Sequence, residues 1–485
     1  MDTYSIPEGS AGARQSELQS LKSVVVIGAG TMGAGIVQVA ATHGWIAYLE
    51  DVDGNAVERA LVGIRKRLDR LVAKGTLSTS DRNEISTRLH PLVYDQAPTD
   101  VDLAIEAVVE DLSIKQNVFR LLQESVGPNA ILATNTSSLP VSRIAEAVAD
   151  PGRVVGMHFF NPAPLMPLVE IIAAKQSSAA ALDHATIVAQ SWGKVTVQAK
   201  DTPGFIVNRV ARGFYLEALR LLGEGVGGID EIDQVMRRFG KFKMGPFELM
   251  DLVGLDVNLA VTTSVWEQMS RAARFAPHEI QQSLVAKGRL GRKTKRGFYA
   301  YDDGGALPAY SVERRSYSVS PLMSDVIRAF AGRAGAGDAG TTEQFILARI
   351  LIAVLNEAAW ALADGVATRE DIDLAMLKGT SYPKGPLAWA DEIGPRTVRG
   401  VLHALNGAVN DKRYASAPYF ANAASEPTQS CVAPSSDALS ASVAPFSDAP
   451  KTSVSPSSDA PSASVAPQSQ PQCEIDPFRN SFSYR

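Results

Sequence analysis

The segment "VVVIGAGTMGAGI", residues 24–36, decides the fold, because an apolar β-branched run passes through three spaced glycines into a helical pattern. Gly28 allows the tight turn after the strand, Gly30 lets the backbone approach a pyrophosphate, and Gly33 lets the helix pack closely on the strand. The first turn of such a helix offers unpaired amide donors and the positive end of the helix dipole. The segment therefore predicts a phosphate-binding turn within a strand–helix–strand unit.

An acidic residue follows at the spacing that a dinucleotide site requires. The next strand-like run, "IAYLED", ends in Asp51, about 20 residues on, where a carboxylate accepts hydrogen bonds from the hydroxyls of an adenosine ribose. No arginine directly follows, and Asp53 would repel a ribose phosphate, so we expect NAD as the cofactor rather than NADP. The simpler alternative, a glycine-rich turn with a surface acid, is disfavoured because strand, helix and acid occur together.

Short β-rich runs alternate with helical patterns over residues 21–203, which is typical of an α/β fold with a doubly wound, Rossmann-type parallel sheet. The runs are "SVVVIG", "IAYLED", "VDLAIEAV", "AILATNT", "RVVGMHFF" and "LVEII". After "DTPGF" the strand signals fade, and helical periodicity predicts an all-α domain over residues 204–301. Residues 1–20 are expected to form a flexible N-terminus.

The helical domain is present twice, at a constant offset of 140 residues, as from Phe205 to Phe345. The recurring residues are Phe205, Arg209, Glu217, Ala218, Gly225, Ile232, Asp233, Met236, Gly245, Pro246, Asp251 and Gly254, matched by Phe345, Arg349, Glu357, Ala358, Gly365, Ile372, Asp373, Met376, Gly385, Pro386, Asp391 and Gly394. We place a linker with one helical stretch at 302–342 and the second copy at 343–410. Residues 411–485, rich in Ser, Ala and Pro, are expected to be a disordered tail.

Composition narrows the class of protein. With 45% hydrophobic and 20% charged residues, the chain of 485 residues can build two or three domains with real cores. A net charge of -5 gives no support for binding nucleic acid or a membrane surface. Both cysteines, Cys431 and Cys473, lie in the tail, so we expect no disulfide framework and no metal site. The polar N-terminus and the interrupted apolar helix "FILARILIAVLNEAAWALA" predict neither signal peptide nor transmembrane span, and we expect a cytoplasmic protein.

Two charged residues follow the strand-like run "AIEAV", where the carboxyl ends of strands face the ligand crevice of an open α/β sheet. Glu110 and Lys115 stand at the entry to a helix and are candidates for the cofactor site. The alternatives are nearly as strong: Glu110 could favour the helix N-terminus, and Lys115 could be a solvated charge.

One imidazole and one carboxylate stand out in the apolar stretch "MHFFNPAPLMPLVEII". His158 follows one strand-like run, Glu170 lies within the next, and a proline-rich connector separates them. If the two runs lie side by side, the carboxylate can hold one ring nitrogen and stabilise the imidazolium. The other nitrogen could then take a hydroxyl proton while hydride leaves the same carbon for the nicotinamide. A satisfied core histidine is the alternative, and the nearby dinucleotide site disfavours it.

Further polar residues are candidates for substrate contacts. In "ATNTSSLPVS" either Ser137 or Ser138 can cap the following helix, which leaves the other free to touch substrate. Asn208 sits early in a helix, where asparagine has poor propensity, and its counterpart in the second copy is Ala348. Because this position differs between the copies, Asn208 is a candidate for contact with the substrate. The alternative is that its side chain only forms hydrogen bonds with the backbone.

The segments "GAGTMGAGI", "ATNTSSL", "GMHFFNPAPLMPLVEII" and "DTPGFIVNR" resemble the L-3-hydroxyacyl-CoA dehydrogenase family over residues 22–301. The resemblance implies His158 as general base, Glu170 as its orienting partner, and Ser137 and Asn208 as hydrogen-bond partners of the substrate. It also implies Glu110 and Lys115 near the nicotinamide, and Lys74 near coenzyme A. A family serine in the same helical hairpin is replaced by Arg67, which departs from the pattern.

The second helical copy resembles long bacterial members of the family that are associated with phenylacetate breakdown, which implies 3-hydroxyadipyl-CoA as substrate. 3-Hydroxybutyryl-CoA is the other acyl-CoA expected. In short members the helical domain makes a homodimer, so this chain is expected either to dimerise or to be a monomer in which the second copy takes the partner's place. Two other functions stay open: oxidation of a free sugar acid, as in L-gulonate 3-dehydrogenase, and dinucleotide binding without catalysis.

Overall fold

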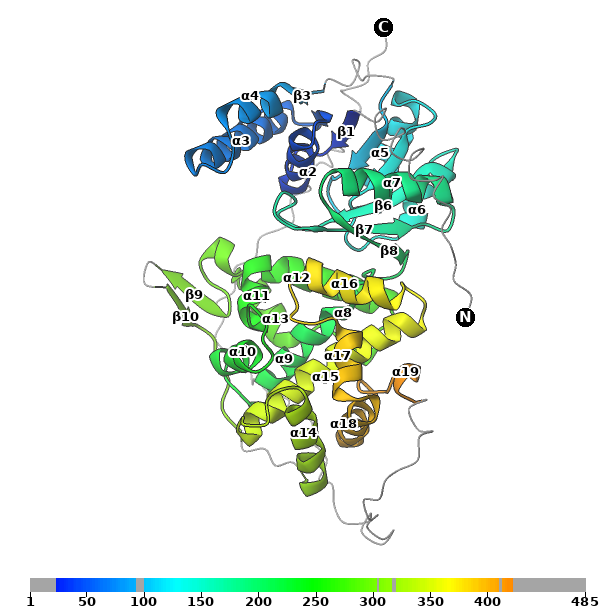
Figure 1. Ribbon diagram of the computed structural model, residues 1–485. Helices are drawn as coiled ribbons and strands as arrows, with labels where there is room; N and C mark the ends of the chain where they lie inside the picture. The colour runs from blue at the N-terminus through cyan, green and yellow to red at the C-terminus, as the bar shows by residue number, and fades with distance from the viewer. Residues whose placement is uncertain (1–22, 93–99, 303–304, 316–319, 410–411, 422–485) are drawn as a thin grey trace, which may run out of the picture. The chain divides into compact units, whose positions relative to one another are not determined.

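The N-terminal part of the computed structural model is an α/β unit around one eight-stranded sheet (Figure 1). The structure describes residues 23–92, 100–302, 305–315, 320–409 and 412–421. The strands are β1 Ser23–Ile27, β2 Ile46–Glu50, β3 Leu89–Pro91, β4 Leu103–Glu106, β5 Ile131–Thr134, β6 Val154–Phe159, β7 Leu168–Ala173 and β8 Val195–Lys200. Their spatial order is β3-β2-β1-β4-β5-β6-β7-β8, and only β6 and β7 pair antiparallel. The predicted Rossmann-type sheet is confirmed.

Helices cover both faces of this sheet. Along β1, Val24 and Val26 belong to one hydrophobic cluster and Val25 to another, because successive side chains of a strand point to opposite faces. Ile36 of α2 packs in the first cluster and Phe119 of α5 in the second. The helices of this unit are α2 Thr31–Thr42, α3 Gly54–Ala73, α4 Thr79–Thr87, α5 Leu112–Ser125, α6 Val141–Ala145, η2 Pro151–Arg153 and α7 Ala179–Ser191.

The strands β3 and β8 form the two edges of the sheet, and the sequence patterns did not indicate them. β3 has only three residues and ends in Pro91, a residue type that sheets confine to edges because it has no amide to donate. β8 is half-exposed along most of its length, so its apolar signal is weak. Both strands follow from the tertiary pairing with β2 and β7 rather than from local pattern.

The described residues after β8 are largely helical. The first copy contains α8 Val207–Val210, α9 Arg212–Gly223, α10 Ile229–Arg238, α11 Pro246–Val253, α12 Leu255–Gln268, η3 Ala273–Phe275, α13 Glu279–Ala286, η4 Arg292–Thr294 and the hairpin of β9 Tyr299–Asp302 and β10 Gly305–Pro308. The rest contains α14 Pro321–Arg333, α15 Thr341–Ala363, α16 Arg369–Gly379, α17 Pro386–Ile393, α18 Pro395–Ala408 and α19 Pro418–Ala421. The helices α9 to α12 thus correspond in order to α15 to α18.

The recurring aspartate and the recurring Gly-Pro pair have a structural reason. The carboxylate of Asp233 accepts hydrogen bonds from the amides of Phe247 (2.9 Å) and Glu248 (3.0 Å) at the start of α11. Asp373 caps α17 in the same way, through Leu387 (2.7 Å) and Ala388 (2.9 Å). The proline that follows each glycine occupies the first helical turn, where its missing amide costs nothing. These repeated residues therefore hold the helical module together.

Two buried ion pairs join the copies reciprocally. Arg209 donates to Glu357 (2.7 Å), and its counterpart Arg349 donates to Glu217 (2.7 Å), the counterpart of Glu357. Arg209 lies on α8, Glu217 on α9, and Arg349 and Glu357 on α15. A Cβ on Gly213 of α9 would lie 2.8 Å from the carbonyl carbon of Ala353 on α15. The copies therefore face each other about a local pseudo-twofold axis, with contact close enough to require glycine.

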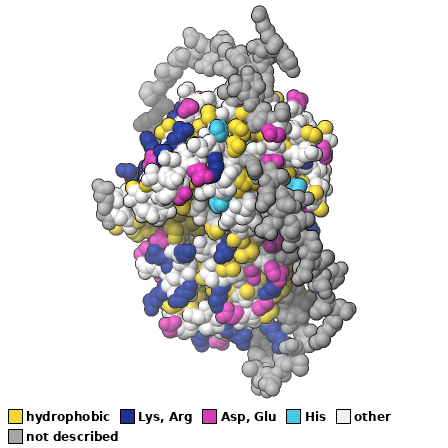
Figure 2. All heavy atoms as spheres, turned by 45° about the horizontal axis from the view of Figure 1, so that its top comes forward, with side chains coloured by type: hydrophobic (Ala, Val, Ile, Leu, Met, Phe, Trp, Pro, Cys, Tyr) yellow, Lys and Arg dark blue, Asp and Glu magenta, His cyan; other side chains and the backbone are white. Residues whose placement is uncertain are grey.

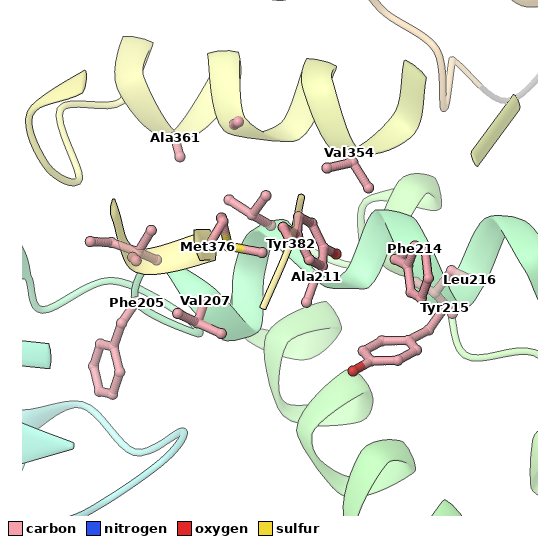
Figure 3. Close-up of a cluster of buried hydrophobic side chains, with 14 of the residues drawn as sticks. Phe205, Val207, Ala211, Phe214, Tyr215, Leu216, Val354, Ala361, Met376 and Tyr382 are labelled. Atoms are coloured by element: carbon pink, nitrogen blue, oxygen red, sulfur yellow. The ribbon is translucent and has the colours of Figure 1, made fainter. Parts of the chain in front are cut away.

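Apolar side chains fill the space between the copies (Figure 3). Val354 and Ala361 of α15 point toward Ala211 between α8 and α9, Met376 of α16, and Tyr382, which follows α16. All five side chains are at most 5% exposed. The two copies consequently share one hydrophobic core.

The expected boundaries need two corrections. The range 302–342, expected to be a linker with one helical stretch, contains that helix as α14, whose Ile327 and Phe330 are buried, and also the hairpin strand β10, which was not expected. The chain also stays ordered past residue 410, because Tyr414 and Phe420 are buried and α19 begins at Pro418. Aromatic residues next to the Ser/Ala/Pro-rich segment supply this apolar area. The expected flexible N-terminus (1–20) and the rest of the expected tail (422–485) lie outside the described residues.

The helix α15 is long and apolar enough to cross a membrane by length and composition alone. Its mean hydropathy is 1.8, but 83% of the apolar window is buried within the fold. The pair α11 and α12 also passes the test together, with a bend of 99° between its members. Burial accounts for the apolar character of α15, which is the central helix of the second copy.

Charges of both signs share the surface. Figure 2 shows Lys and Arg side chains interspersed with Asp and Glu side chains on the face that it draws. Exposed ion pairs such as Arg59–Asp53 and Lys384–Glu392 join the two kinds elsewhere in the described chain. On the drawn face, charged side chains of both signs are thus mixed rather than gathered in one patch of a single sign.

We predict that Glu217→Gln lowers the free energy of unfolding by about 3 kcal/mol, because Arg349 would lose its fully buried carboxylate and keep only Glu224, whose side chain is 27% exposed. Urea unfolding followed by circular dichroism measures the change. The matched control is Glu392→Gln, which breaks a pair whose side chains are 46% and 55% exposed and should cost less than about 1 kcal/mol. Equal losses in the two variants would contradict the structural role of the buried pair.

Candidate active site

The glycine turn has the geometry of a phosphate cradle. Gly28 has φ +107°, and a Cβ there would lie 2.6 Å from the carbonyl oxygen of Ala107. A Cβ on Gly33 would lie 1.8 Å from the Gly28 carbonyl oxygen, so the fold itself requires both glycines. A Cβ on Gly30 would meet nothing within 4 Å, and α2 begins there without a side-chain cap. The turn therefore presents open space and uncapped amides, which fit a pyrophosphate.

The acid at the end of β2 holds this turn. Asp51 accepts hydrogen bonds from the amides of Ala29 (2.7 Å) and Asp53 (3.0 Å), one on each carboxylate oxygen. The side chain is half-buried, and each oxygen retains a lone pair for a ribose hydroxyl. Asp51 thus lies against the glycine turn, as an NAD site requires, and also fixes the shape of that turn.

Glu110 and Lys115 belong to one network at the carboxyl end of β4, in which Lys115 is buried and Glu110 is exposed. Lys115 is 1% exposed and donates to Glu106 (2.6 Å), with Glu110 3.3 Å away, so the interpretation of Lys115 as a solvated charge is wrong. Burial raises the pKa of Glu106, and the nearby charge of Lys115 opposes this shift only in part, so the pKa stays raised. Burial also acts to raise the pKa of Glu110, but Lys115 and donors from Thr136, Ser137 and Ser138 lower it overall. Glu110 is therefore held as a carboxylate over this edge of the sheet.

His158 and Glu170 face each other across the antiparallel pair β6 and β7. The register places them directly opposite, and Nδ1 of His158 lies 2.6 Å from Oε2 of Glu170. The side chains are 5% and 0% exposed. The other carboxylate oxygen accepts from the amides of Ile206 (3.1 Å) and Val207 (3.0 Å) at the start of α8. Within the described chain Nε2 of His158 has no hydrogen-bond partner, so one ring nitrogen is held and the other is available.

A buried lysine that carried no sequence signal fixes the connector between β6 and β7. Lys194 donates to the carbonyl oxygens of Ala163 (2.6 Å) and Met166 (2.8 Å). Burial lowers its pKa, and no carboxylate of the described residues pairs with it. The ring of Phe160, the first residue after β6, lies 4.6 Å from the His158 ring. The connector is thereby anchored beside the imidazole.

The expectation that Ser137 or Ser138 caps the next helix is wrong. Asp201 instead accepts from the amides of Val141 (2.9 Å) and Ser142 (2.7 Å) at the start of α6. No local pattern indicates this cap, because Asp201 lies about 60 residues away along the chain and reaches α6 only in the fold. Both serine amides donate to Glu110, and the Ser138 hydroxyl does so as well (3.0 Å). The Ser137 hydroxyl makes no hydrogen bond among the described residues.

Asn208 lies at the junction between the sheet and the helices. Its Nδ2 donates to the Ser137 carbonyl oxygen over 3.3 Å, and its neighbour Val207 bonds to Glu170. Four segments thus meet through Glu110, Ser137, Asn208 and the His158–Glu170 pair. Gln268 of α12 adds a further bond, to the Ser138 carbonyl oxygen (2.9 Å).

Lys74 stands apart from these groups. It caps the C-terminus of α3, is exposed, and lies in the helical hairpin of α3 and α4 (Figure 1). Arg67 on the same helix donates to Gln38 of α2 (2.7 Å). Among the described residues, no hydrogen bond or ion pair joins either residue to the cluster around His158. A role for Lys74 therefore stays a prediction.

A dehydrogenase needs a dinucleotide cradle and a proton acceptor at the same edge of its sheet, and this chain carries both at the carboxyl ends of parallel strands. The chain is thus an NAD-dependent oxidoreductase. Residues 23–202 match the 3-hydroxyacyl-CoA dehydrogenase NAD-binding domain, and residues 204–301 and 345–428 each match the C-terminal domain of the same enzymes. The chain belongs to the 3-hydroxyacyl-CoA dehydrogenase family, as the resemblance implied.

Relatives cover most of the chain. 3-Hydroxyadipyl-CoA dehydrogenase of Escherichia coli (strain K12) is 36% identical over 454 residues, which cover 81% of this chain and 96% of that protein. 3-Hydroxybutyryl-CoA dehydrogenase of Clostridioides difficile is 39% identical and covers 58% of this chain and 99% of its own length. The crystal structure of 3-hydroxybutyryl-CoA dehydrogenase from Escherichia coli K12 matches with TM-score 0.73 and 34% identity over 83% of this chain and 98% of that one.

Glu50, next to Asp51, makes stability depend on pH. Burial, with a smaller effect from the Asp51 charge, raises its pKa from 4.5 to about 7. Because the folded state holds this proton more tightly than the unfolded chain, the contribution of Glu50 to stability is complete below about pH 4.5 and is lost as the pH rises through about 7. We predict that Glu50→Gln flattens this decline in thermal unfolding midpoints. The exposed Glu58→Gln is the control, and an unchanged profile in Glu50→Gln would contradict the assignment.

Proposed function

We propose that the chain oxidises an L-3-hydroxyacyl-CoA to the 3-ketoacyl-CoA with NAD, and that His158 is the general base. The observation that carries this proposal is the buried cross-strand pair of His158 and Glu170, with Nδ1 held at 2.6 Å. Fixing Nδ1 selects the tautomer whose Nε2 can take a proton from the substrate hydroxyl. The Glu170 carboxylate then stabilises the imidazolium.

The chain's own residues would hold the cofactor and orient the substrate. The turn of Gly28, Gly30 and Gly33 receives the pyrophosphate, Asp51 binds the adenosine ribose, and Glu110 and Lys115 lie on the nicotinamide side. Bound NAD supplies the hydride acceptor. Asn208 and the Ser137 hydroxyl bond to the substrate's hydroxyl or carbonyl oxygen, which fixes the reacting carbon relative to His158. Lys74 binds the coenzyme A moiety from the helical hairpin.

The acyl group is proposed to be 3-hydroxyadipyl or 3-hydroxybutyryl. The relatives in the comparisons bear both names, so they support the acyl-CoA class and leave the chain length open. The relative with the adipyl name extends over 96% of its own length along this chain, through the second helical copy. The solved structure that bears the butyryl name spans 83% of this chain, so the extent of the match does not choose between the two substrates.

We predict that His158→Ala lowers kcat about 10²- to 10⁴-fold, because the hydroxyl proton loses its acceptor. NAD affinity should stay within about twofold, since His158 does not contact the glycine turn. Initial rates of NADH formation and fluorescence titration of the cofactor measure the two effects. His184→Ala, on α7, is the matched control histidine and should keep full activity. Full turnover by His158→Ala would contradict its role as base.

The reciprocal ion pairs support a second proposal, that the chain is a monomer. The second copy covers the α9 face of the first, as a partner's helical domain would, and the two share one core. The α9 face is therefore already covered, and a second chain could not bind to it. Light scattering should give the mass of a single chain, and a homodimer joined through α9 would contradict the proposal.

A further inference from the structure

Arg212, at the start of α9, is a buried cation without a counterion. It is 3% exposed, and it donates to the carbonyl oxygens of Asn208 (2.9 Å) and Asn258 (3.1 Å) and to the Thr262 hydroxyl (2.7 Å). The guanidinium carbon lies 4.9 Å from the centre of the Tyr215 ring. Within the described residues no carboxylate pairs with it, and Nη2 has no hydrogen-bond acceptor.

Such an arrangement is costly, because a buried charge is normally paired. The neutral acceptors that bind Arg212 explain how α8 is tied to α12, but they do not neutralise the charge. The other buried arginines of the helical core show the contrast: Arg209 and Arg349 both face carboxylates. Arg212 therefore has its charge and its Nη2 donors left for an anion.

A second buried polar group near Arg212 is also unsatisfied. The hydroxyl of Tyr382 has no hydrogen-bond partner in the described structure, although the residue is only 5% exposed. Burial lowers the pKa of Arg212, and the phenols of Tyr215 and Tyr382 lie near enough to oppose that shift. Figure 3 shows Tyr382 beside Ala211, the residue before Arg212. One ligand oxygen could accept from both the guanidinium and the phenol.

The duplication shows that the helical module does not need these polar groups. At the 140-residue offset, Arg212, Tyr215, Asn258 and Thr262 of the first copy correspond to Ile352, Leu355, Val398 and Leu402. Those four counterparts are at most 1% exposed and lie in the apolar core. Tyr382 corresponds to Phe242, whose ring packs edge-on against it at 4.9 Å. The polar cluster is thus confined to the side of the molecule that carries Asn208.

The cluster adjoins the proposed active site through two elements. Arg212 bonds to the main chain of Asn208, whose side chain reaches Ser137 (3.3 Å). Thr262 lies on α12, and Gln268 at the end of the same helix donates to Ser138 (2.9 Å). The guanidinium is therefore linked by hydrogen bonds, through Asn208, to the residues that are proposed to orient the substrate.

We propose that Arg212 and Tyr382 bind a carboxylate at the far end of the acyl chain, so that the enzyme selects dicarboxylic acyl-CoA substrates. This inference rests on the proposed function and identifies its substrate class. An arginine fork matches a carboxylate, and the phenol donates a further hydrogen bond. The second helical copy contributes Tyr382 and so takes part in specificity.

Binding of two unreactive ligands tests the proposal without turnover. Adipyl-CoA and hexanoyl-CoA have acyl chains of equal length, differ in the terminal carboxylate, and lack the 3-hydroxyl that would be oxidised. Calorimetric titration in the presence of NAD should show that the wild type binds adipyl-CoA more tightly. Arg212→Met should lower this preference about 10- to 100-fold, as expected for lost hydrogen bonds to a charged group. Its affinity for hexanoyl-CoA should change little.

Tyr382→Phe is the second variant and has its own diagnostic. It keeps the ring, as in the counterpart Phe242, and removes only a hydroxyl that has no partner. The free protein should unfold at the same temperature or higher, while adipyl-CoA affinity falls about 10-fold. If the tyrosine were merely structural, its substitution would not lower adipyl-CoA affinity while leaving the unfolding temperature unchanged or higher. If Arg212→Met does not fold, Tyr382→Phe decides alone.

Each result has a definite meaning. Loss of the adipyl preference in either folded variant supports the carboxylate site. A wild type without preference, or a preference that survives both substitutions, overturns it. Because neither ligand is turned over, failure of the NADH assay would count against the proposed oxidation and leave this binding result intact.

Discussion

The carboxylate of Glu170 is the constraint on which the rest of the site depends. It is fully buried, and both oxygens of a buried carboxylate need hydrogen-bond donors from the protein. One oxygen holds His158 and the other receives the first amides of α8, so a single group orients the imidazole and joins the sheet to the helical part. Asn208, one residue past those amides, is placed by the same contact. The antiparallel turn of β6 into β7, within an otherwise parallel sheet, creates this geometry.

The second helical copy shows how a duplicated module can be divided between support and chemistry. The residues common to both copies cap helices or form reciprocal ion pairs, as Asp233 and Glu217 do with their counterparts. Near the proposed active site the first copy is polar where the second is apolar, as with Asn208 against Ala348 and Arg212 against Ile352, whereas Tyr382 of the second copy stands against Phe242. The second copy thus keeps the residues that bind the first copy, and it has apolar core residues at the positions that correspond to Asn208 and Arg212.

The sequence predicted features whose cause is local. The glycine turn and the alternation of strands and helices around it follow from short motifs and periodicity, and the pairing of His158 with Glu170 follows once their two strands lie side by side. Features that arise from contacts between distant parts of the chain were missed. Asp201 caps α6, and Lys194 anchors the connector between β6 and β7. Strand β8 has a weak local pattern and forms by pairing with β7. The burial of Arg212 without a carboxylate partner was also not indicated by the sequence, because it too arises from distant contacts. No pattern along the chain reveals that a lysine, arginine or aspartate will be buried without its usual partner.

The most direct test of the central claim is NADH formation by the purified wild-type protein with NAD and, in parallel, L-3-hydroxyadipyl-CoA, L-3-hydroxybutyryl-CoA and L-gulonate. The proposed chemistry at His158 predicts turnover of the CoA thioesters, with the adipyl compound favoured by kcat/KM. Turnover of gulonate alone would contradict the acyl-CoA assignment. Bound NAD without turnover of any of the three would contradict catalysis itself.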